Sequence, residues 1–514
     1  MNIKQAKDYI ENTVRLYLKK DEFGEYRIPV VRQRPVFLLG APGIGKTAIM
    51  EQIAQELSIA LVSYSMTHHT RQSALGLPFI SHKEYQGMKF DISEYTMSEI
   101  IASIYEVMEK SGIKEGILFL DEINCVSETL APSMLQFLQY KVFGRHSVPD
   151  GWVIVTAGNP PEYNKSVREF DVVTMDRLKV LEVEADYKAW KEYAQQKGLH
   201  AAILNFLELK KEYFYKIETT VNGRSYVTAR GWEDLSEILC LYEEEGMKVD
   251  ETLVEQYIRN ERVVKEFTAY YDLFNKYKKE YQTEEILAGM VQAQTVERAR
   301  IAAFDERISL LGMLTDKVIS EIREDMEISD YLVELIKNLK AIKAAVEKDI
   351  ASEKAGQITV MQMLQNQVEG RMKQMESARM AGSLSERERR KGRRIVQFLE
   401  EEKKQLLLEG IIEEKASFEL LKAAFDARTR ELKRRSEQTR LRIENLFDFV
   451  ENAFAEGNEM LILVTELTVN NDSARFISQF GCPAYEKHNQ ELMLSERQNS
   501  LQNEIAALDL EGIV

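Results

Sequence analysis

Short apolar runs alternate with helical stretches between residues 34 and 186. Each run is four to six residues long and is bounded by charged or turn-forming residues. This alternation is typical of a parallel sheet whose strands are joined by crossover helices. We therefore predict an α/β core over residues 34–186. The strands expected in it are Val36–Leu39, Ala60–Ser65, Gly116–Leu120, Trp152–Ala157 and Lys179–Val183.

Helical periodicity dominates on both sides of this core. An apolar stripe predicts an amphipathic helix over residues 3–19, within an N-terminal helix and linker of residues 1–33. Residues 187–262 are expected to form a small helical lid. Residues 263–514 contain no proline before Pro483 and repeat apolar residues about every 3.5 positions, which predicts an elongated, coiled-coil-like helical domain.

Turn-forming residues divide this helical region. Gly382-Ser383-Leu384-Ser385 is expected to be a turn between two helices, because glycine and serine favour helix ends. Asn470-Asn471-Asp472-Ser473 is expected to be the cap of a later helix. Gly481-Cys482-Pro483 is expected to stop that helix before a last one begins.

A phosphate-binding loop follows the first predicted strand. The chain reads Gly-Ala-Pro-Gly-Ile-Gly-Lys-Thr from residue 40 to residue 47, which fits G-x-x-x-x-G-K-[ST]. Glycines let successive backbone N–H groups point at a phosphate, and the start of the next helix adds its dipole. Lys46 is expected to bind the β- and γ-phosphates of ATP, and Thr47 is expected to bind Mg²⁺. The residues expected to contact the nucleotide are Gly40, Ala41, Pro42, Gly43, Ile44, Gly45, Lys46, Thr47 and Ala48.

Two carboxylates end the strand Gly116–Leu120. In a nucleoside triphosphatase, an acid at this place holds Mg²⁺ and a second acid acts as the general base. We therefore expect Asp121 to bind the metal and Glu122 to polarise the attacking water. Taken without the phosphate loop, such a pair of acids at a strand end is as often simply solvated.

Three more polar residues complete the expected site. Asn159 follows the neighbouring strand, where its amide can bind the attacking water or the γ-phosphate, although Asn-Pro also marks ordinary turns. Arg177 precedes the fifth strand, and Arg230 begins a helix of the expected lid. A guanidinium group suits the charge of a phosphoryl transition state. Either arginine considered alone is more typical of a surface ion pair.

These motifs together resemble an AAA+ ATPase, and most closely its MoxR branch. The resemblance is carried by Gly40–Gly43, Asp121–Asn124, Thr156–Pro160, Asp176–Leu178 and the arginine–tryptophan–glutamate stretch around Arg230. It covers residues 34 to 242. The family usually has phenylalanine where this chain has Leu178, and commonly proline where it has Ala229.

The resemblance implies a P-loop AAA+ fold and several further properties. Arg177 would be an arginine finger that reaches a neighbouring subunit's nucleotide, and Arg230 would act within its own subunit. The chain would form a homo-oligomeric, hexameric ring that remodels a protein client, together with a von Willebrand factor A domain partner. ATP is preferred over GTP by the family alone. Loops at residues 65–93 and 141–151 would contact the client by analogy, or be ordinary surface loops.

Composition limits the alternatives. The formal charge of −16 disfavours membranes and broad nucleic-acid binding, and three distant cysteines suit a reducing compartment, so we expect a cytoplasmic protein. A nucleic-acid motor and a nucleotide-gated helical scaffold remain the alternatives. The basic run 387–394 lacks aromatic residues and is read as a solvated helix end. The adjacent His68 and His69 lack ligands at metal-binding spacing.

Overall fold

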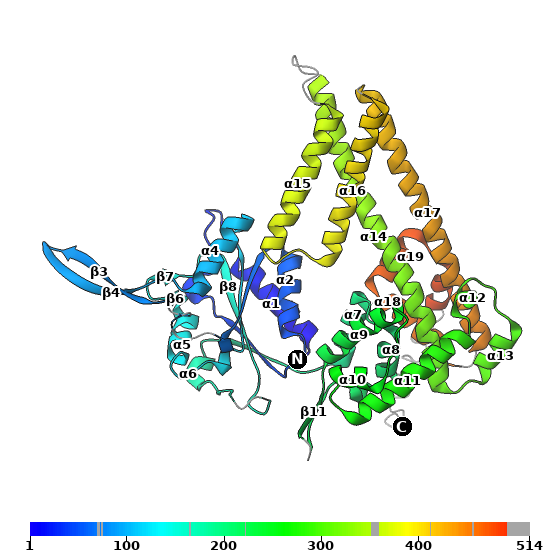
Figure 1. Cartoon of the computed structure of the whole chain (residues 1–514), viewed down its shortest axis with the longest axis horizontal. Coiled ribbons are helices and arrows are strands. Elements are labelled where there is room, and N and C mark those ends of the chain that lie inside the picture. Colours follow the sequence, from blue (N-terminus) through cyan, green and yellow to red (C-terminus); the bar gives the residue numbers. More distant parts are fainter. Residues whose placement is uncertain are drawn as a thin grey trace, which may run out of the picture. The chain divides into compact units, whose positions relative to one another are not determined.

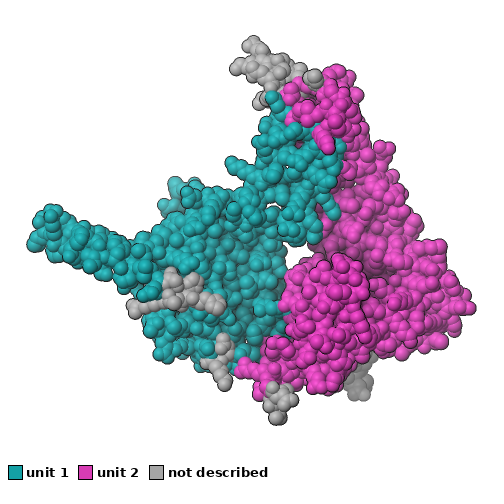
Figure 2. Space-filling model, in the orientation of Figure 1, with its two compact units in different colours: residues 1–189, 228–230, 362–403 teal, residues 190–227, 231–361, 404–514 magenta. Residues whose placement is uncertain are grey.

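A computed structural model describes residues 1–490 apart from 69–71, 73, 75, 164–165, 221–222, 351–358, 412 and 455–456. Its contacts divide the chain into two compact units (Figures 1 and 2). Unit 1 comprises residues 1–189, 228–230 and 362–403, and unit 2 comprises residues 190–227, 231–361 and 404–514. Of the His68–His69 pair, His69 lies outside the described residues.

Unit 1 is built on a five-stranded parallel sheet of order β2-β5-β8-β1-β9. Every residue of β8 is buried, and so are the first five of β5, because helices cover both faces of such a sheet. The predicted α/β core and all five of its strands are confirmed. The strands are β1 (Val36–Gly40), β2 (Ala60–Ser65), β5 (Gly116–Asp121), β8 (Trp152–Gly158) and β9 (Lys179–Val183).

The helices of unit 1 flank this sheet. The predicted N-terminal helix is present as α1 (Ile3–Tyr17), which buries its apolar stripe and is capped by Asn2. The helices that connect the strands are α2 (Lys46–Leu57), α4 (Glu99–Ser111), α5 (Ala131–Tyr140) and α6 (Val172–Met175).

Two hairpins extend from the connections of unit 1. The longer one, β3 (Pro78–Tyr85) with β4 (Met88–Tyr95), projects away from the sheet as a separate arm (Figures 1 and 2). Its turn is Gln86-Gly87, and both residues have positive φ. The shorter hairpin, β6 (Val142–Phe143) with β7 (His146–Ser147), lies in the loop expected before β8.

Unit 2 is almost entirely helical. Two long helices, α14 (Phe304–Ile350) and α17 (Glu414–Ala453), pack along each other. The other elements are α7 (Tyr187–Lys197), α8 (Ala201–Leu209), β10 (Lys216–Thr220), β11 (Gly223–Val227), α9 (Ala229–Glu244), α10 (Glu251–Tyr257), α11 (Glu261–Glu280), α12 (Thr283–Leu287), α13 (Ala293–Ile301), α18 (Glu459–Val469) and α19 (Asn471–Phe480). The long helices predicted for the C-terminal region are confirmed, and Asn470 caps α19 as expected.

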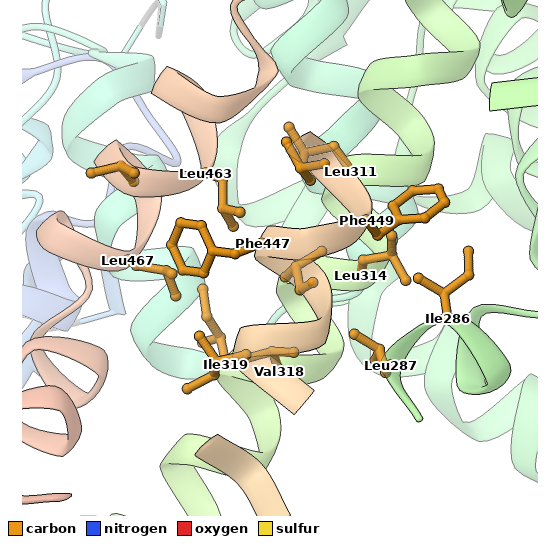
Figure 3. Close-up of a cluster of buried hydrophobic side chains, with 14 of the residues drawn as sticks. Ile286, Leu287, Leu311, Leu314, Val318, Ile319, Phe447, Phe449, Leu463 and Leu467 are labelled. Atoms are coloured by element: carbon orange, nitrogen blue, oxygen red, sulfur yellow. The ribbon is translucent and has the colours of Figure 1, made fainter. Parts of the chain in front are cut away.

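A large apolar cluster holds the helices of unit 2 together. Phe447 of α17 is fully buried among Leu314 and Val318 of α14 and Leu463 and Leu467 of α18 (Figure 3). Burying large apolar side chains in this way contributes about 1.5–3 kcal/mol each. The cluster therefore joins segments that lie more than a hundred residues apart in the sequence.

The hairpin of α15 (Val360–Met380) and α16 (Glu386–Glu409) divides between the two units. The turn predicted at residues 382–385 lies between these helices. The sequence assigned residues 263–514 to one helical domain, whereas the contacts place residues 362–403 in unit 1. The reason is that Ala381, at the turn, is fully buried in the core of unit 1.

Candidate functional site

The phosphate loop joins β1 to α2. β1 ends at Gly40 and α2 begins at Lys46, so the loop leads directly into a helix N-terminus. Gly45 has a φ of 95°, a backbone conformation that a residue with a Cβ atom rarely adopts. At Gly43, a Cβ atom would lie 2.9 Å from the Cβ atom of Thr228. The glycines thus let the loop fold against the segment that contains Arg230.

Lys46 lies buried at the centre of this loop. Its Nζ donates hydrogen bonds to the carbonyl oxygens of Gly40 (2.7 Å) and Ala41 (2.8 Å) and to Oδ1 of Asn159 (2.9 Å). Burial, aided by the charge of Arg230, lowers the pKa of Lys46 to about 8 against the opposing effect of Asp121. Lys46 therefore has dipolar partners and no carboxylate in direct contact, which suits a cation that is to bind phosphate.

Thr47 and Asp121 meet beside Lys46. The Thr47 hydroxyl donates to Oδ2 of Asp121 at 3.1 Å, while Oδ1 of Asp121 accepts the backbone N–H of Glu122 at 2.8 Å. Hydroxyl and carboxylate oxygens are the ligands that Mg²⁺ prefers. The two residues expected to hold the metal are therefore adjacent, and their donor atoms fit it.

Glu122 has an unusual environment. Its backbone is in the left-handed region with a φ of 55°. Its Oε2 accepts hydrogen bonds from the hydroxyls of Ser65 (2.9 Å) and Thr67 (3.0 Å). Ser65 ends β2, whose register places it opposite Asp121. The carboxylate expected to act as general base is thus held by the end of the neighbouring strand.

Asn159 follows β8, the strand that lies between β1 and β5 in the sheet. Its carbonyl oxygen accepts a hydrogen bond from Nδ2 of Asn124 at 2.8 Å. A Cβ atom at Gly158, which ends β8, would lie 2.5 Å from Oδ1 of Asn124, so glycine at this position leaves room for the Asn124 side chain. Asn124 therefore fixes the position of Asn159 beside Lys46.

The two arginines differ in their surroundings. Arg230 begins α9, and its backbone N–H donates to the carbonyl of Gly43 at 3.3 Å, which places it at the phosphate loop. Arg177 follows α6 and is exposed, one residue before the buried Leu178. The structure thus brings Lys46, Thr47, Asp121, Glu122, Asn159 and Arg230 together at the carboxyl ends of the strands. Arg177 lies instead on the surface of unit 1.

Comparison with known proteins agrees with this geometry. Residues 36–174 match the model of the ATPase family associated with various cellular activities (AAA). Over these residues the chain is similar to an AAA domain. This match supports nucleotide binding and a P-loop ATPase in general, and members of this family generally form oligomeric rings. No curated protein matches the chain.

Motif analysis missed the residues that orient the AAA domain's functional side chains. Ser65 and Thr67 bind Glu122, and Asn124 binds Asn159, yet none of the three had been given a role. A signal was present for Ser65, because polar residues at the carboxyl ends of parallel strands face the same edge of the sheet.

Other sequence signals have ordinary structural explanations. The basic run lies in α16, where Arg389 pairs with Glu386 and Lys391 pairs with Glu388. Among the described residues, no group of three or more histidine, cysteine, aspartate or glutamate side chains has the arrangement of a metal site. Within the same residues, no helix combines the length and the hydropathy needed to span a bilayer.

Proposed function

We propose that this chain is a Mg²⁺-dependent ATPase that hydrolyses ATP in a homo-oligomeric ring and uses the energy to remodel a protein client. The observation that carries the proposal is the convergence of Lys46, Thr47, Asp121 and Glu122 at one edge of the sheet. Lys46 and Thr47 begin α2, whereas Asp121 ends β5 and Glu122 follows it. Phosphoryl transfer needs a cation for the phosphates, oxygen ligands for Mg²⁺ and a carboxylate base, and these four residues provide such groups.

Binding of the triphosphate would depend on the phosphate loop. Backbone N–H groups at the start of α2 would surround the phosphates, and the helix dipole would favour their negative charge. The Lys46 ammonium would exchange the carbonyls of Gly40 and Ala41 for phosphate oxygens. Such charge-assisted hydrogen bonds are about twice as strong as neutral ones.

The metal would be held by Thr47 and Asp121, whose oxygens are 3.1 Å apart. When bound, Mg²⁺ would neutralise charge on the β- and γ-phosphate oxygens. Glu122 would accept a proton from the attacking water as general base. Asn159 would orient this water or the γ-phosphate, and Arg230 would stabilise the charge that develops on the phosphate.

Hydrolysis would be completed by Arg177 of a neighbouring subunit. Its exposure on unit 1 suits a group that acts across a subunit interface.

The sequence resemblance is the basis for the other parts of the proposal. These are the MoxR-like assignment, a hexameric ring, a von Willebrand factor A domain partner and a cytoplasmic location. The acidic net charge of −16 and the ion-paired basic run argue for a protein client over a nucleic acid.

A Glu122→Gln variant tests the proposed chemistry. We expect it to bind ATP like the wild type in titration calorimetry, because the amide keeps the size of the side chain. Its hydrolysis rate should fall by about 10²–10⁴-fold, the usual contribution of a general base.

The matched control is Glu106→Gln, which changes an exposed carboxylate on α4 and should leave the rate unaltered. DNA and RNA should not accelerate the wild-type enzyme. If wild-type protein supplied with Mg²⁺ neither binds nor hydrolyses ATP, the proposed function is wrong.

A further inference from the structure

The turn between α15 and α16 is attached to the edge of the sheet in unit 1. The backbone N–H of Leu61, in β2, donates to the carbonyl oxygen of Ala381 at 2.8 Å. β2 is an edge strand, so this N–H has no partner strand on that side. The Ser377 hydroxyl donates to the carbonyl of Ser111 at the end of α4. Two hydrogen bonds thus connect the turn to the AAA domain.

The apolar side of this contact is also well formed. Ala381 is fully buried, in the same core cluster as Ala60 and Val62 of β2. Such complete burial indicates a packed contact and not a loose surface approach. The turn therefore belongs to the structural core of unit 1, although about 300 residues of sequence separate it from β2.

The turn itself is conformationally defined. The N–H of Ser383 bonds to the carbonyl of Ala378 (2.9 Å), and that of Gly382 bonds to Arg379 (3.1 Å), which is the Schellman arrangement. Gly382 has the positive φ of 68° that this arrangement requires. The hydroxyl of Ser385 then accepts the N–H of Glu388 and caps α16. Displacement of either helix would therefore move the turn as a unit.

The two helices are packed together and extend beyond unit 1. A Cβ atom at Gly392 of α16 would lie 2.5 Å from Sδ of Met375 in α15, so glycine permits their close approach. Lys403 of α16 donates to the side chain of Gln365 of α15. α16 continues without a break from residue 403, in unit 1, to residue 409, in unit 2.

The other end of β2 reaches the expected catalytic carboxylate. Ser65, four residues after Leu61, donates to Glu122, and Thr67 donates to the same oxygen. At about 3.3 Å per residue, the docked turn is about 13 Å along the strand from this hydroxyl. β2 thus contacts the turn near its start and ends at Ser65, one partner of Glu122, while Thr67 lies two residues beyond the strand.

From this geometry we propose that the α15–α16 turn regulates the ATPase in cis. By holding β2, it keeps the hydroxyls of Ser65 and Thr67 on Glu122 and thereby slows hydrolysis. Movement of α15 and α16 loosens β2 and lets the carboxylate reach the attacking water. The inference rests on the proposed ATPase function and adds its regulation by the C-terminal helices.

A reversible crosslink tests the proposal. A Cβ atom at position 382 would lie 3.7 Å from Cβ of Leu61, within the range that a disulfide spans. We therefore choose the double variant Leu61→Cys and Gly382→Cys, with formation of the bond followed by mass spectrometry. Oxidation should lower kcat by at least about threefold at unchanged ATP affinity, and a reductant should restore it. The reduced double variant is the reference, because it carries the same strain at position 382.

The controls separate this proposal from the proposed function. Wild-type protein, oxidised in the same way, accounts for Cys125, Cys240 and Cys482 and must show ATPase activity before the comparison is made. If the wild type is inactive, the proposed function fails first. If the oxidised double variant hydrolyses ATP as fast as the reduced one, or faster, the regulatory proposal is overturned.

A second variant decides the question should the crosslink not form. Ser377→Ala removes a hydrogen bond between the turn and α4, and it should raise kcat without altering the affinity for ATP. Thr429→Ala is its control, because the Thr429 hydroxyl donates to the carbonyl of Phe425 within α17. Equal kcat values for the two variants and the wild type would contradict the proposal.

Discussion

Two lysines, the buried Lys46 in unit 1 and the largely buried Lys191 in unit 2, have opposite electrostatic surroundings. Lys46 is bound by two backbone carbonyls and an amide, and burial lowers its pKa to about 8. Burial also acts to lower the pKa of Lys191, but Glu466 and Glu208, each 2.9 Å away, outweigh it and raise the pKa above the usual range.

The difference shows how each unit uses a buried positive charge. The carboxylates around Lys191 neutralise it, so this lysine joins α7, α8 and α18 and has little charge left for a ligand. Lys46 is held only by dipoles, and its desolvation cost can be offset by an incoming phosphate. For these two lysines, the partners thus separate a charge that is available to a ligand from one that is used for cohesion.

The largest expected effect concerns a third cation, Arg177, which we propose acts between subunits. Arg177→Ala should leave ATP affinity unchanged but lower the hydrolysis rate by about 10³–10⁵-fold, the usual contribution of an arginine finger. The physical reason is that the guanidinium stabilises charge only in the transition state. Single-turnover hydrolysis and ATP titration measure the two quantities separately.

Mixing experiments test whether Arg177 acts in trans. Subunits with Arg177→Ala retain Glu122, and subunits with Glu122→Gln retain Arg177. Mixed assemblies should therefore recover part of the activity at sites that combine one intact residue from each subunit. Failure to recover activity at any ratio would argue against action between subunits.

The next largest effect comes from replacing each buried lysine with methionine, which keeps the length of the side chain and removes its charge. Lys46→Met should weaken ATP binding by about 100-fold, since charge-assisted hydrogen bonds are lost, with little effect on the urea midpoint. Lys191→Met removes the lysine partner of Glu466 and leaves Glu208 with Lys211 alone, and it should destabilise unit 2 by about 2–3 kcal/mol while preserving ATP affinity. If the two variants changed the urea midpoint and the ATP affinity to similar extents, the proposed difference between Lys46 and Lys191 would be contradicted.

The same contrast explains what the sequence could predict. Lys46 was predicted because its partners follow from a local motif between a strand and a helix, and the five parallel strands followed from short apolar runs. Lys191 was not predicted, because Glu466 is 275 residues away and no spacing rule connects them. The docking of Ala381 on β2 was missed for the same reason.

The hairpin β3–β4 was missed although it had a local signal. Gln86-Gly87 is a two-residue turn with positive φ at both positions, and apolar and polar residues alternate from Met88 to Ser93 in the strand that follows it. The sequence-based interpretation treated residues 65–93 as an insertion loop. The aromatic residues of the hairpin do not form the buried face that a strand usually has. Phe79, Tyr85 and Phe90 are each more than 40% exposed.

The smallest expected effect is a pH dependence of ATP binding that comes from Lys46. Its pKa of about 8 in the free protein reflects burial and Arg230, partly offset by Asp121 and Glu122. Bound phosphate would favour the protonated form, so binding should take up a proton near pH 8–9. Affinity should then change little through Lys46 below pH 7 and fall by up to about tenfold per pH unit above 8.

Lys46→Arg gives the matched control for this pH dependence, because a guanidinium group does not lose its proton in this range. Calorimetry in two buffers of different ionisation enthalpy measures the proton uptake directly. The wild type and Lys191→Met should both take up a proton on binding ATP at pH 8.5, whereas Lys46→Arg should not. If the pH profile of the wild type matches that of Lys46→Arg, then Lys46 is fully protonated before ATP binds, and its low pKa cannot be what separates it from Lys191.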